Sequence, residues 1–396
     1  MTGEFASHKR QAEAAGEQEA QAMVLQQAFQ RDPALWLARM RLDDPVFFFD
    51  PARLRATAAL FMAHFPGEVT YAVKANPEGA VLDGLAAAGM AGFDVASVEE
   101  MAQVRRAAPE ARLHYHNPVR SMTEIAAARR FGITSWSVDR RSELDKLGPL
   151  EGTEVAVRLK LPVAGAAYDF GSKFGAGPEE TGALLRAVVA KGGMPSLTFH
   201  PGTQCREAKA WETYIRAAAG IAACAGIRLH RLNVGGGFPA HREEPAPDLP
   251  ALFSAIDRAV AAAFGKNRPA LVCEPGRAMV AEAFDLALRI KAREGETIFL
   301  NDGIYGGLAE WRDIAPSTRV TVLDPDGVPR SGESRRMTVF GPTCDSLDRL
   351  PDGLRLPVGL EEGDYLLFRG CGAYSSALAT RFNGYGARQI VTLARQ

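Results

Sequence analysis

The sequence predicts an α/β protein: a (β/α)8 barrel over about residues 45–282, followed by a mostly antiparallel β domain over residues 283–396. Two observations carry this prediction. In the first region, eight short apolar strands alternate with alanine-rich helical stretches, and the strands end in polar or glycine residues. In the second region, strand-like segments follow one another across turns. A doubly wound open sheet is the rival, but a barrel rim better explains why candidate functional residues follow nearly every strand.

The elements are expected in the following order. Residues 1–30 are rich in Ala, Glu and Gln and predict a helical or flexible N-terminal extension. Residues 46–50 predict a strand that joins the β domain, and Pro51 opens a helix that runs to about His64. The barrel strands are expected at residues 69–74, 92–97, 112–118, 135–139, 154–161, 195–200, 231–238 and 269–276. Helices expected between them include Val81–Met90, Glu99–Ala107 and Ala208–Ala225.

The composition narrows the class of protein. The 396 residues carry a formal net charge of −1, so no overall field favours nucleic acid or an anionic membrane. Five cysteines are scattered without a Cys-x-x-Cys pair, which fits a reducing compartment and argues against a disulfide framework or a zinc ribbon. The polar N-terminus lacks the apolar core of a signal peptide, and no stretch approaches the roughly 20 apolar residues of a membrane helix. We therefore expect a cytoplasmic protein without a metal, nucleic-acid or membrane partner.

Lys74 stands in the segment TYAVKANP, where Asn76-Pro77 stops a strand of β-branched and aromatic residues. It therefore sits at the C-terminal end of a barrel strand. One interpretation is a lysine whose stem lies along apolar surface while its ammonium reaches water. The other is a Schiff-base lysine, which needs a partly desolvated environment that lowers its pKa. The residues at the ends of the other strands distinguish between these two interpretations of Lys74.

Two glycine-containing loops follow the last two barrel strands. Residues 233–238, NVGGGF, follow the seventh strand, and Glu274-Pro275-Gly276-Arg277 follow the eighth. Such loops can point backbone N–H groups at one anion, although a plain strand–helix turn is the alternative for either loop alone. Because the loops after strands seven and eight of a barrel often hold a phosphate, the pair favours a phosphate-bearing cofactor.

Glu274 and His200 each end one of these strands. A carboxylate after the apolar residues LVC needs a partner, which is either Arg277 or a protonated pyridine nitrogen. His200 ends the segment PSLTFH and either stacks on an aromatic ring or is a satisfied core histidine.

Two segments near the C-terminus carry further candidates. Cys344-Asp345 place a thiol and a carboxylate in the turn GPTCD, a pair that is structural in most proteins. Gly372-Ala373-Tyr374 are expected to open a helix, where N–H groups and a phenol could bind phosphate.

Together and in this order, the motifs resemble the ornithine decarboxylase family, the pyridoxal-phosphate (PLP) enzymes of the alanine-racemase-like fold. The resemblance runs from about Phe47 to Gly386. It rests on the segments YAVKANP, GFDVAS, SKFGA (172–176), TFHPGTQ, NVGGGFP, EPGR, NDGIYGG (301–307), GPTCDSLD (341–348) and GAYSSALATRFNGYG (372–386). Cys344-Asp345 match the ornithine/lysine branch, since diaminopimelate and biosynthetic arginine decarboxylases tend to carry a glutamate after the cysteine.

The resemblance implies a role for each matched residue. Lys74 binds PLP through a Schiff base, Glu274 binds the pyridinium nitrogen, and His200 stacks on the ring. Asp94 and Arg158 line the cofactor side of the barrel mouth. The phosphate is bound by a set of hydroxyl, backbone and guanidinium groups at Thr203, Gly236, Gly237, Gly276, Arg277 and Tyr374.

The resemblance also implies the reaction and the assembly. Cys344 protonates the product carbanion, and Asp345 lies beside the distal end of the substrate. Both residues, with Phe382, reach the active site of a partner subunit, which implies a homodimer with shared sites. The implied activity is decarboxylation of a basic L-amino acid of the ornithine or lysine type. A glutamate at position 274 agrees, because it keeps the ring nitrogen protonated and the ring a strong electron sink. A racemase of this fold usually has an arginine there.

Other activities stay open because the sequence departs from the family pattern. The family has a Tyr-Asp pair about seven residues after its NDGxYG segment, and its aspartate grips the distal amine. Here that region reads LAEWRDI, so Glu310, Asp313 or neither takes this role, and Arg312 would repel an ammonium if it faced the substrate. Pro201 and Thr203 replace the usual valine and serine. The alternatives are a decarboxylase of a modified basic amino acid, a racemase, or a non-catalytic homologue.

Overall fold

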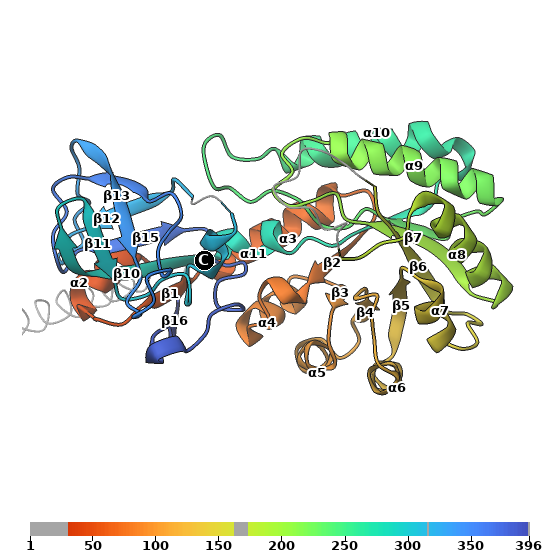
Figure 1. The fold of residues 1–396 in the computed structure, drawn as a ribbon, viewed down its shortest axis with the longest axis horizontal. Helices are drawn as coiled ribbons and strands as arrows, with labels where there is room; N and C mark the ends of the chain where they lie inside the picture. Colours follow the sequence, from red (N-terminus) through yellow and green to blue (C-terminus); the bar gives the residue numbers. More distant parts are fainter. Residues whose placement is uncertain (1–30, 162–172, 315–316, 395–396) are drawn as a thin grey trace, which may run out of the picture. The chain divides into compact units, whose positions relative to one another are not determined.

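The computed structural model describes residues 31–161, 173–314 and 317–394, and it divides the chain into two compact units (Figure 1). The barrel unit comprises Arg53–Ala283 and Gly370–Leu378. The β unit comprises the chain up to Ala52, Phe284–Arg369 and the chain from Ala379 onward. The predicted extension over residues 1–30 and the start of the SKFGA segment lie outside the described residues.

Eight parallel strands close the barrel unit, as the alternation of strands and helices predicts. Their apolar residues are buried nearly throughout, which is the pattern of strands covered on both faces. Each strand pairs with the next in sequence, and the first also pairs with the last, which closes the barrel. The strands are β2 (Glu68–Ala72), β3 (Gly92–Val95), β4 (Arg112–Tyr115), β5 (Ile133–Val138), β6 (Glu154–Leu159), β7 (Met194–Phe199), β8 (Arg231–Asn233) and β9 (Ala270–Cys273).

Helices between the strands cover the outside of the barrel (Figure 1). Local signals set several of their ends: the Ser97 side chain caps one, Ser121 and Glu124 form a capping box at another, and Gly226 ends a third at φ 67°. The helices are α3 (Pro51–His64), α4 (Gly79–Ala87), α5 (Val98–Ala107), α6 (Met122–Arg130), α7 (Arg141–Lys146), α8 (Pro178–Ala190), α9 (Lys209–Ala225), α10 (Leu249–Phe264) and α11 (Arg277–Val280). Short 3-10 turns lie at η1 (Val73–Ala75), η3 (Gly265–Asn267) and η4 (Ala281–Ala283).

The β unit is a mostly antiparallel sheet, which confirms the second half of the fold prediction. Its strand order is β12-β15-β10-β11-β13-β14, and β1 joins it by pairing antiparallel with β10. Two pairs, β1 with β16 and β11 with β13, are parallel. The elements are α2 (Pro33–Met40), β1 (Val46–Phe49), β10 (Phe284–Glu294), β11 (Thr297–Leu300), η5 (Ala309–Arg312), β12 (Val320–Leu323), β13 (Ser334–Phe340), β14 (Leu354–Pro357), β15 (Tyr365–Arg369), η6 (Phe382–Gly384) and β16 (Gln389–Thr392).

The strand at residues 46–49 belongs to this sheet because its side chains are all apolar and buried there. Phe48 packs against Trp36 of α2, with ring centroids 5.4 Å apart. Both belong to one core cluster with Tyr365 and Leu367 of β15. The β unit therefore starts before the barrel and resumes after it.

The prediction of a helix after Ala373 is wrong. This segment forms bends and turns, and only the single 3-10 turn η6 (Phe382–Gly384) follows. Tyr374 has a φ of 53°, and its N–H donates to the Ala75 carbonyl at 2.8 Å, so the segment is held by the barrel unit rather than by its own backbone. Gly370–Leu378 accordingly belong to the barrel unit, although the sequence places all of residues 283–396 in the second domain.

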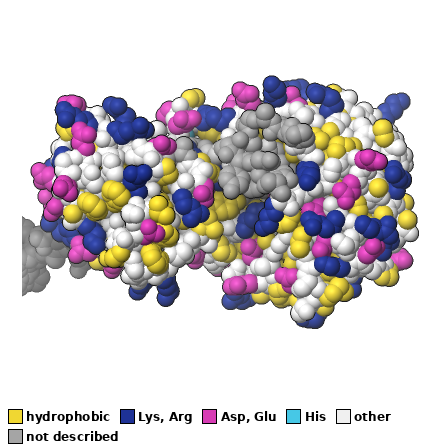
Figure 2. Space-filling view, in the orientation of Figure 1, with side chains coloured by type: hydrophobic (Ala, Val, Ile, Leu, Met, Phe, Trp, Pro, Cys, Tyr) yellow, Lys and Arg dark blue, Asp and Glu magenta, His cyan; other side chains and the backbone are white. Residues whose placement is uncertain are grey.

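The distribution of surface charge and the character of the helices are relevant to binding of nucleic acid or a membrane. Basic and acidic side chains are interspersed over the face shown in Figure 2, and neither sign forms one continuous area. None of the helices that the structure describes has the length and apolar character needed to cross a bilayer.

Candidate active site

Polar side chains at the ends of the barrel strands converge on one cavity of about 190 Å³. Parallel strands present their C-terminal ends at the same rim, so residues far apart in the sequence meet there. The polar lining consists of Lys74, Asp94, His116, Asn117, Arg158, Thr198, His200 and Glu274. The predicted residues Lys74, Asp94, Arg158, His200 and Glu274 are thus brought together, while their chemical roles stay predictions.

Lys74 lies in η1, directly after β2, and is the only lysine among the residues that line this cavity. Burial lowers the pKa of its ammonium, but Asp94, Tyr374 and Glu274 together outweigh burial and raise the pKa above its ordinary value. The expectation of a lowered pKa is therefore wrong for this arrangement. The carboxylates hold Lys74 charged, and the amine has to lose that proton before it can attack a carbonyl carbon.

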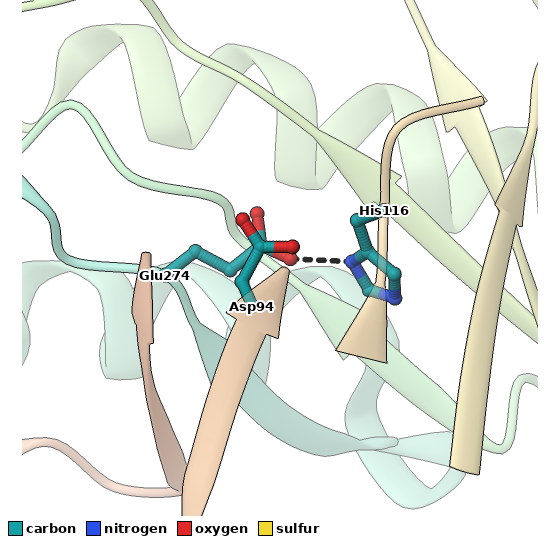
Figure 3. Close-up of side chains that lie close together, drawn as sticks. All are labelled: Asp94, His116 and Glu274. Carbon is teal, nitrogen blue, oxygen red and sulfur yellow. Dashed lines mark hydrogen bonds and ion pairs between the residues drawn. The ribbon is translucent and has the colours of Figure 1, made fainter. Parts of the chain in front are cut away.

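Glu274 follows β9 and is bound by two neighbours. His116 Nδ1 is hydrogen-bonded to Glu274 Oε1, and Asn233 Nδ2 donates to the same oxygen at 2.6 Å (Figure 3). Burial alone would raise the pKa of Glu274, but the interaction with His116 outweighs burial and lowers it to about 2. Arg277, the ion-pair partner considered from the sequence, is not among these hydrogen-bond partners. Glu274 is therefore an ionised carboxylate aimed at the cavity.

Asp94 points toward the same place from β3, and in Figure 3 its carboxylate lies beside the Glu274 carboxylate and the His116 imidazole. One donor atom from each of the three side chains lies within 4.8 Å of the others. Burial and the neighbouring Glu274 charge raise the pKa of Asp94 to about 7. Two carboxyl groups in one cavity are thus driven apart in pKa, which is a frequent property of functional sites.

His200 follows β7 and is neutral at physiological pH. Burial, with the nearby Arg158 and Lys74 charges, lowers the pKa of its imidazole to about 3. Its Nδ1 accepts the Gly202 N–H at 3.3 Å, which holds the ring in place. The Arg158 guanidinium lies over the Phe174 ring, 5.4 Å from its centroid. A fixed neutral imidazole in the wall of the cavity suits stacking on an aromatic ring.

The NVGGGF loop leaves no room for side chains beside the cavity. A Cβ on Gly236 would lie 2.7 Å from the Glu274 carbonyl oxygen, and one on Gly237 would lie 2.8 Å from the Gly202 carbonyl oxygen. Gly237 also has a φ of 86°, which residues with a Cβ rarely adopt. Glycine is required here because backbone segments approach one another closely, as in a loop that binds an anion through N–H groups.

Arg277, Thr203 and Tyr374 lie together at the start of α11. Arg277 Nη2 is 3.4 Å from Thr203 Oγ1, and its guanidinium lies 5.0 Å from the centroid of the Tyr374 ring. A Cβ on Gly276 would lie 3.4 Å from the Tyr374 hydroxyl. A cation, two hydroxyl groups and two glycine loops thus share one neighbourhood, and this is a donor set for a phosphate.

The β unit gathers a second group of predicted residues. Cys344 is exposed, and its N–H donates to Asn383 Oδ1 at 3.2 Å. Asp345 accepts the Tyr305 hydroxyl at 2.5 Å, which lowers the pKa of this carboxyl group. The Tyr305 ring packs against Phe382 with centroids 5.1 Å apart. Cys344, Asp345 and Phe382 are therefore near one another within this unit.

The region that departs from the family pattern lies in and after η5. Asp313 is exposed and forms a two-bond ion pair with its neighbour Arg312, at 3.1 and 3.2 Å. Glu310 is buried, with 6% of its surface exposed. The Arg312 charge is therefore neutralised locally, while binding of a substrate by Asp313 or Glu310 stays a prediction.

Sequence analysis missed three residues of these sites: His116, Asn233 and Tyr305. His116 follows β4 and Asn233 ends β8, so both obey the rule that polar residues at barrel strand ends line the mouth. Applying that rule to every strand would have found them. Tyr305 stands inside the segment NDGIYGG, but its contact with Asp345 spans 40 positions of sequence, so nothing local identifies this partner.

PLP fits the residues of the barrel unit. The cavity offers an amine for its aldehyde, an ionised carboxylate for its ring nitrogen and a neutral imidazole for its ring face. The phosphate donor set at Thr203, Arg277 and Tyr374 completes the match.

Comparisons with known proteins agree with a PLP-binding barrel. The model of the pyridoxal-binding domain of pyridoxal-dependent decarboxylases matches residues 52–281. The lysine/ornithine decarboxylase of Selenomonas ruminantium is 33% identical over 334 residues, covering 81% of this chain and 82% of that protein. A decarboxylase of Aspergillus flavus, flvG, is 31% identical over 337 residues, covering 80% and 77%.

Solved structures show the same likeness in three dimensions. The lysine/ornithine decarboxylase of Vibrio vulnificus complexed with cadaverine has a TM-score of 0.76 and 27% identity, covering 89% of this chain and 95% of that one. The lysine decarboxylase of Selenomonas ruminantium has a TM-score of 0.77 and 29% identity, covering 90% and 94%. The chain therefore belongs to the ornithine/lysine-type family of PLP-dependent decarboxylases.

Proposed function

We propose that this decarboxylase acts on a basic L-amino acid of the ornithine or lysine type and releases the corresponding amine. The carrying observation is the convergence of Lys74, Glu274 and His200 on one cavity at the barrel rim. The names of the relatives from Selenomonas ruminantium and Vibrio vulnificus support the substrate class. So does the Cys344-Asp345 pair, which matches the ornithine/lysine branch.

Residues of the barrel unit hold and tune the cofactor in this proposal. Bound PLP supplies the electron sink that accepts the electron pair left when the α-carboxylate departs as CO2. Lys74 holds it covalently through Nζ. Glu274 keeps a proton on the ring nitrogen, because an ionised carboxylate with a pKa of about 2 stabilises a neighbouring cation. His200 stacks on the ring while staying neutral.

The phosphate donor set orients the cofactor. Thr203, Arg277 and Tyr374 offer side-chain donors, and Gly236, Gly237 and Gly276 offer close backbone approach. Fixing the phosphate end holds the reacting end in one orientation relative to Lys74, and orientation of this kind accounts for much of enzymatic rate acceleration. The Asp94 carboxyl group, whose pKa is raised to about 7, and the Arg158 guanidinium line the wall of the same cavity.

Cys344 and Asp345 act on the substrate in this proposal. Cys344 delivers its Sγ proton to the α-carbon after CO2 has left. Asp345 stays ionised, because the Tyr305 hydroxyl and the Leu347 N–H stabilise its charged form, and it attracts the distal ammonium of the substrate. We further propose that these two residues serve the partner's active site in a homodimer, with Phe382 at the interface.

Mixing two inactive variants tests the shared site. Lys74→Ala and Cys344→Ala proteins each lack one half of every site, so subunit exchange should restore up to about a quarter of the activity of the wild type. Activity that stays at the level of the separate variants, after exchange is verified by mass-labelled subunits, would remove the shared site.

A decarboxylase of a modified basic amino acid is the second candidate. The segment Trp311-Arg312-Asp313 favours it, because the family's Tyr-Asp pair is absent and Asp313 is engaged by Arg312. The discriminating experiment presents the PLP-loaded enzyme with ornithine, lysine, arginine, diaminopimelate and N-substituted or hydroxylated basic analogues, and measures CO2 release and product mass. Fast turnover of ornithine or lysine supports the first proposal, and turnover of an analogue alone supports the second. Inversion without CO2 would indicate a racemase, and failure to bind PLP a non-catalytic homologue.

We also propose a reducing, cytoplasmic environment. The five cysteines are scattered along the sequence without a Cys-x-x-Cys pair, which fits a compartment that keeps thiols reduced.

A further inference from the structure

His116 lies directly after β4, with 7% of its surface exposed, and its two ring nitrogens have different partners. Nδ1 meets Glu274 Oε1, and Nε2 lies 3.0 Å from Ser135 Oγ on β5. An ionised carboxylate only accepts hydrogen bonds, so Nδ1 carries the proton and donates to Glu274. Asn233 Nδ2 also lies 3.2 Å from Nδ1, but an amide nitrogen is a donor and cannot accept the Nδ1 proton. The Nδ1–H is therefore directed at Glu274.

Asn233 completes the arrangement around Glu274. Its Oδ1 accepts the Gly235 N–H at 2.9 Å, which fixes the orientation of the amide and turns Nδ2 toward Glu274 Oε1. The hydrogen bonds that join the Glu274 side chain to other described residues thus both end on Oε1. The second carboxylate oxygen, Oε2, is left to meet a ligand in the cavity.

We propose that His116 is a positioning residue for Glu274: by donating its Nδ1–H to Oε1, it orients the carboxylate so that Oε2 faces the ring nitrogen of bound PLP. This inference rests on the proposed function, because it assigns Glu274 to that nitrogen. His116 itself need not touch the cofactor ring to act.

Ser135 makes this contact independent of the protonation state of His116. A serine hydroxyl donates to a neutral Nε2 and accepts from a protonated one. The Nδ1–H bond to Glu274 persists in both cases. Burial lowers the pKa of His116, but the Glu274 and Asp94 carboxylates outweigh burial and raise it, which further favours a protonated donor.

The first experiment compares His116→Ala with His116→Asn. Loss of one hydrogen bond to a charged group predicts about tenfold weaker PLP affinity and about tenfold lower kcat in His116→Ala, with KM for the amino acid within about twofold. Asparagine places an amide nitrogen near the position of Nδ1, so His116→Asn should recover both quantities to within about threefold of the wild type. PLP affinity is measured by titrating the apoenzyme and following the visible absorbance of the bound cofactor.

His114→Ala is the matched control. His114 lies on β4, two positions before His116, is also buried and stacks on His116 with ring centroids 5.4 Å apart, but it does not line the cavity. PLP affinity and kcat should stay within about twofold of the wild type in this variant. Equal losses in His114→Ala and His116→Ala would mean that general packing of β4 matters, and would overturn the proposal.

A double mutant separates this inference from the proposed function. If His116 acts through Glu274, adding His116→Ala to Glu274→Ala should change PLP affinity and kcat by less than about twofold. An undiminished loss in that background would overturn the positioning role alone. Full PLP affinity and kcat in Glu274→Ala itself would instead remove the proposed role of Glu274. If His116→Ala fails to fold, His116→Gln replaces it. The glutamine amide lies near the position of Nε2 and not of Nδ1, so this variant should lose the contact to Glu274 that His116→Asn keeps. Equal PLP affinity and kcat in the Asn and Gln variants would overturn the proposal.

Discussion

The barrel unit holds two clusters of charged side chains, and they differ in how firmly their charges are paired. The floor cluster consists of Glu68, Glu154, Ser196 and Arg231, near the N-terminal ends of strands. Arg231 forms ion pairs with both Glu68 and Glu154, and Ser196 Oγ donates to Glu154 at 2.6 Å. Burial alone would raise the pKa of Glu154, but Arg231 outweighs burial and lowers it to about 2.

The rim cluster consists of Lys74, Asp94, His116, Arg158 and Glu274, at the C-terminal ends of strands. Glu274 is paired with His116 and has a pKa lowered to about 2, while burial and the Glu274 charge raise the pKa of Asp94 to about 7. One carboxyl group is thus held ionised, and another is left to titrate near neutral pH.

The comparison shows how one barrel uses buried charge in two ways. His114 and His116, two positions apart, belong to the two ends: His114 lies 3.8 Å from Glu68, and His116 contacts Glu274. A closed ion-pair network resists change of protonation and supports the fold, while an incompletely paired cluster at a cavity is prepared to meet a ligand.

The largest expected effect is the loss of activity in Lys74→Ala, which breaks the rim cluster alone. We expect kcat/KM to fall more than about 1,000-fold, because the covalent attachment of the cofactor is removed. The free energy of unfolding of the apoenzyme should change by less than about 1 kcal/mol, since Asp94 can take up a proton. Steady-state kinetics and urea unfolding of the apoenzyme measure both quantities. A stable but still active and yellow variant would contradict the assignment of Lys74.

Arg231→Leu should lower stability and leave activity nearly unchanged, because it breaks the floor cluster alone. It leaves the Glu68 and Glu154 carboxylates without their shared cation, so we expect a loss of about 3 kcal/mol in the free energy of unfolding. The kcat of the folded enzyme should stay within about twofold of the wild type. Urea unfolding measures the first quantity, and a loss below about 1 kcal/mol would show that the network is not stabilising.

Adding Glu68→Gln and Glu154→Gln to Arg231→Leu provides the control. Removing the stranded charges should recover part of the lost stability, because an unpaired buried charge costs more than a neutral amide.

The two clusters should respond to pH with opposite signs. Glu154 has a folded-state pKa depressed from 4.5 to about 2, so its contribution to stability is present above pH 4.5 and lost as pH falls toward 2. Asp94 has a folded-state pKa raised from 3.8 to about 7, so its contribution is present below pH 3.8 and lost as pH rises through 7. Unfolding free energies of the apoenzyme across this range, for wild type, Glu154→Gln and Asp94→Asn, test this. Glu154→Gln should remove the loss of stability toward pH 2, and Asp94→Asn should remove the loss toward pH 7. A pH profile of stability that stays unaltered in either variant would contradict the pKa shift assigned to that residue.

The smallest effect is expected for Arg112→Ala, which removes a second cation from Glu68 of the floor cluster. Arg112 binds the same Glu68 carboxylate at 2.7 Å, but half of its side chain is exposed, against 15% for Arg231. Exposed ion pairs contribute little, so we expect a loss below about 1 kcal/mol. A thermal melt compared with that of Arg231→Leu measures it, and equal losses would mean that burial of the cation is not what matters.

Much of this organisation could be predicted from local patterns. Alternating apolar strands and helices predicted the barrel, and the apolar run at residues 46–49 was correctly assigned to the C-terminal sheet. Lys74, His200 and Glu274 were singled out because each follows an apolar strand, and all three line one cavity, while their roles stay predictions. These signals lie within a few residues of the position that they describe.

Other features depended on partners distant in the sequence. Tyr374 was expected in a helix, but its backbone is held by Ala75, so a long-range hydrogen bond replaced local propensity. Lys74 was expected to have a lowered pKa, but Asp94, Tyr374 and Glu274 together raise it.

The sequence by itself determined the barrel, the β unit and the strand ends that supply cofactor-binding candidates, because periodicity and strand-end polarity are local properties. Only the tertiary structure decided which of these candidates pair. His116 and Glu274 are 158 positions apart, and nothing near either residue identifies the other. They meet because closing an eight-stranded barrel brings the ends of its strands to one rim, where burial and charge set their protonation.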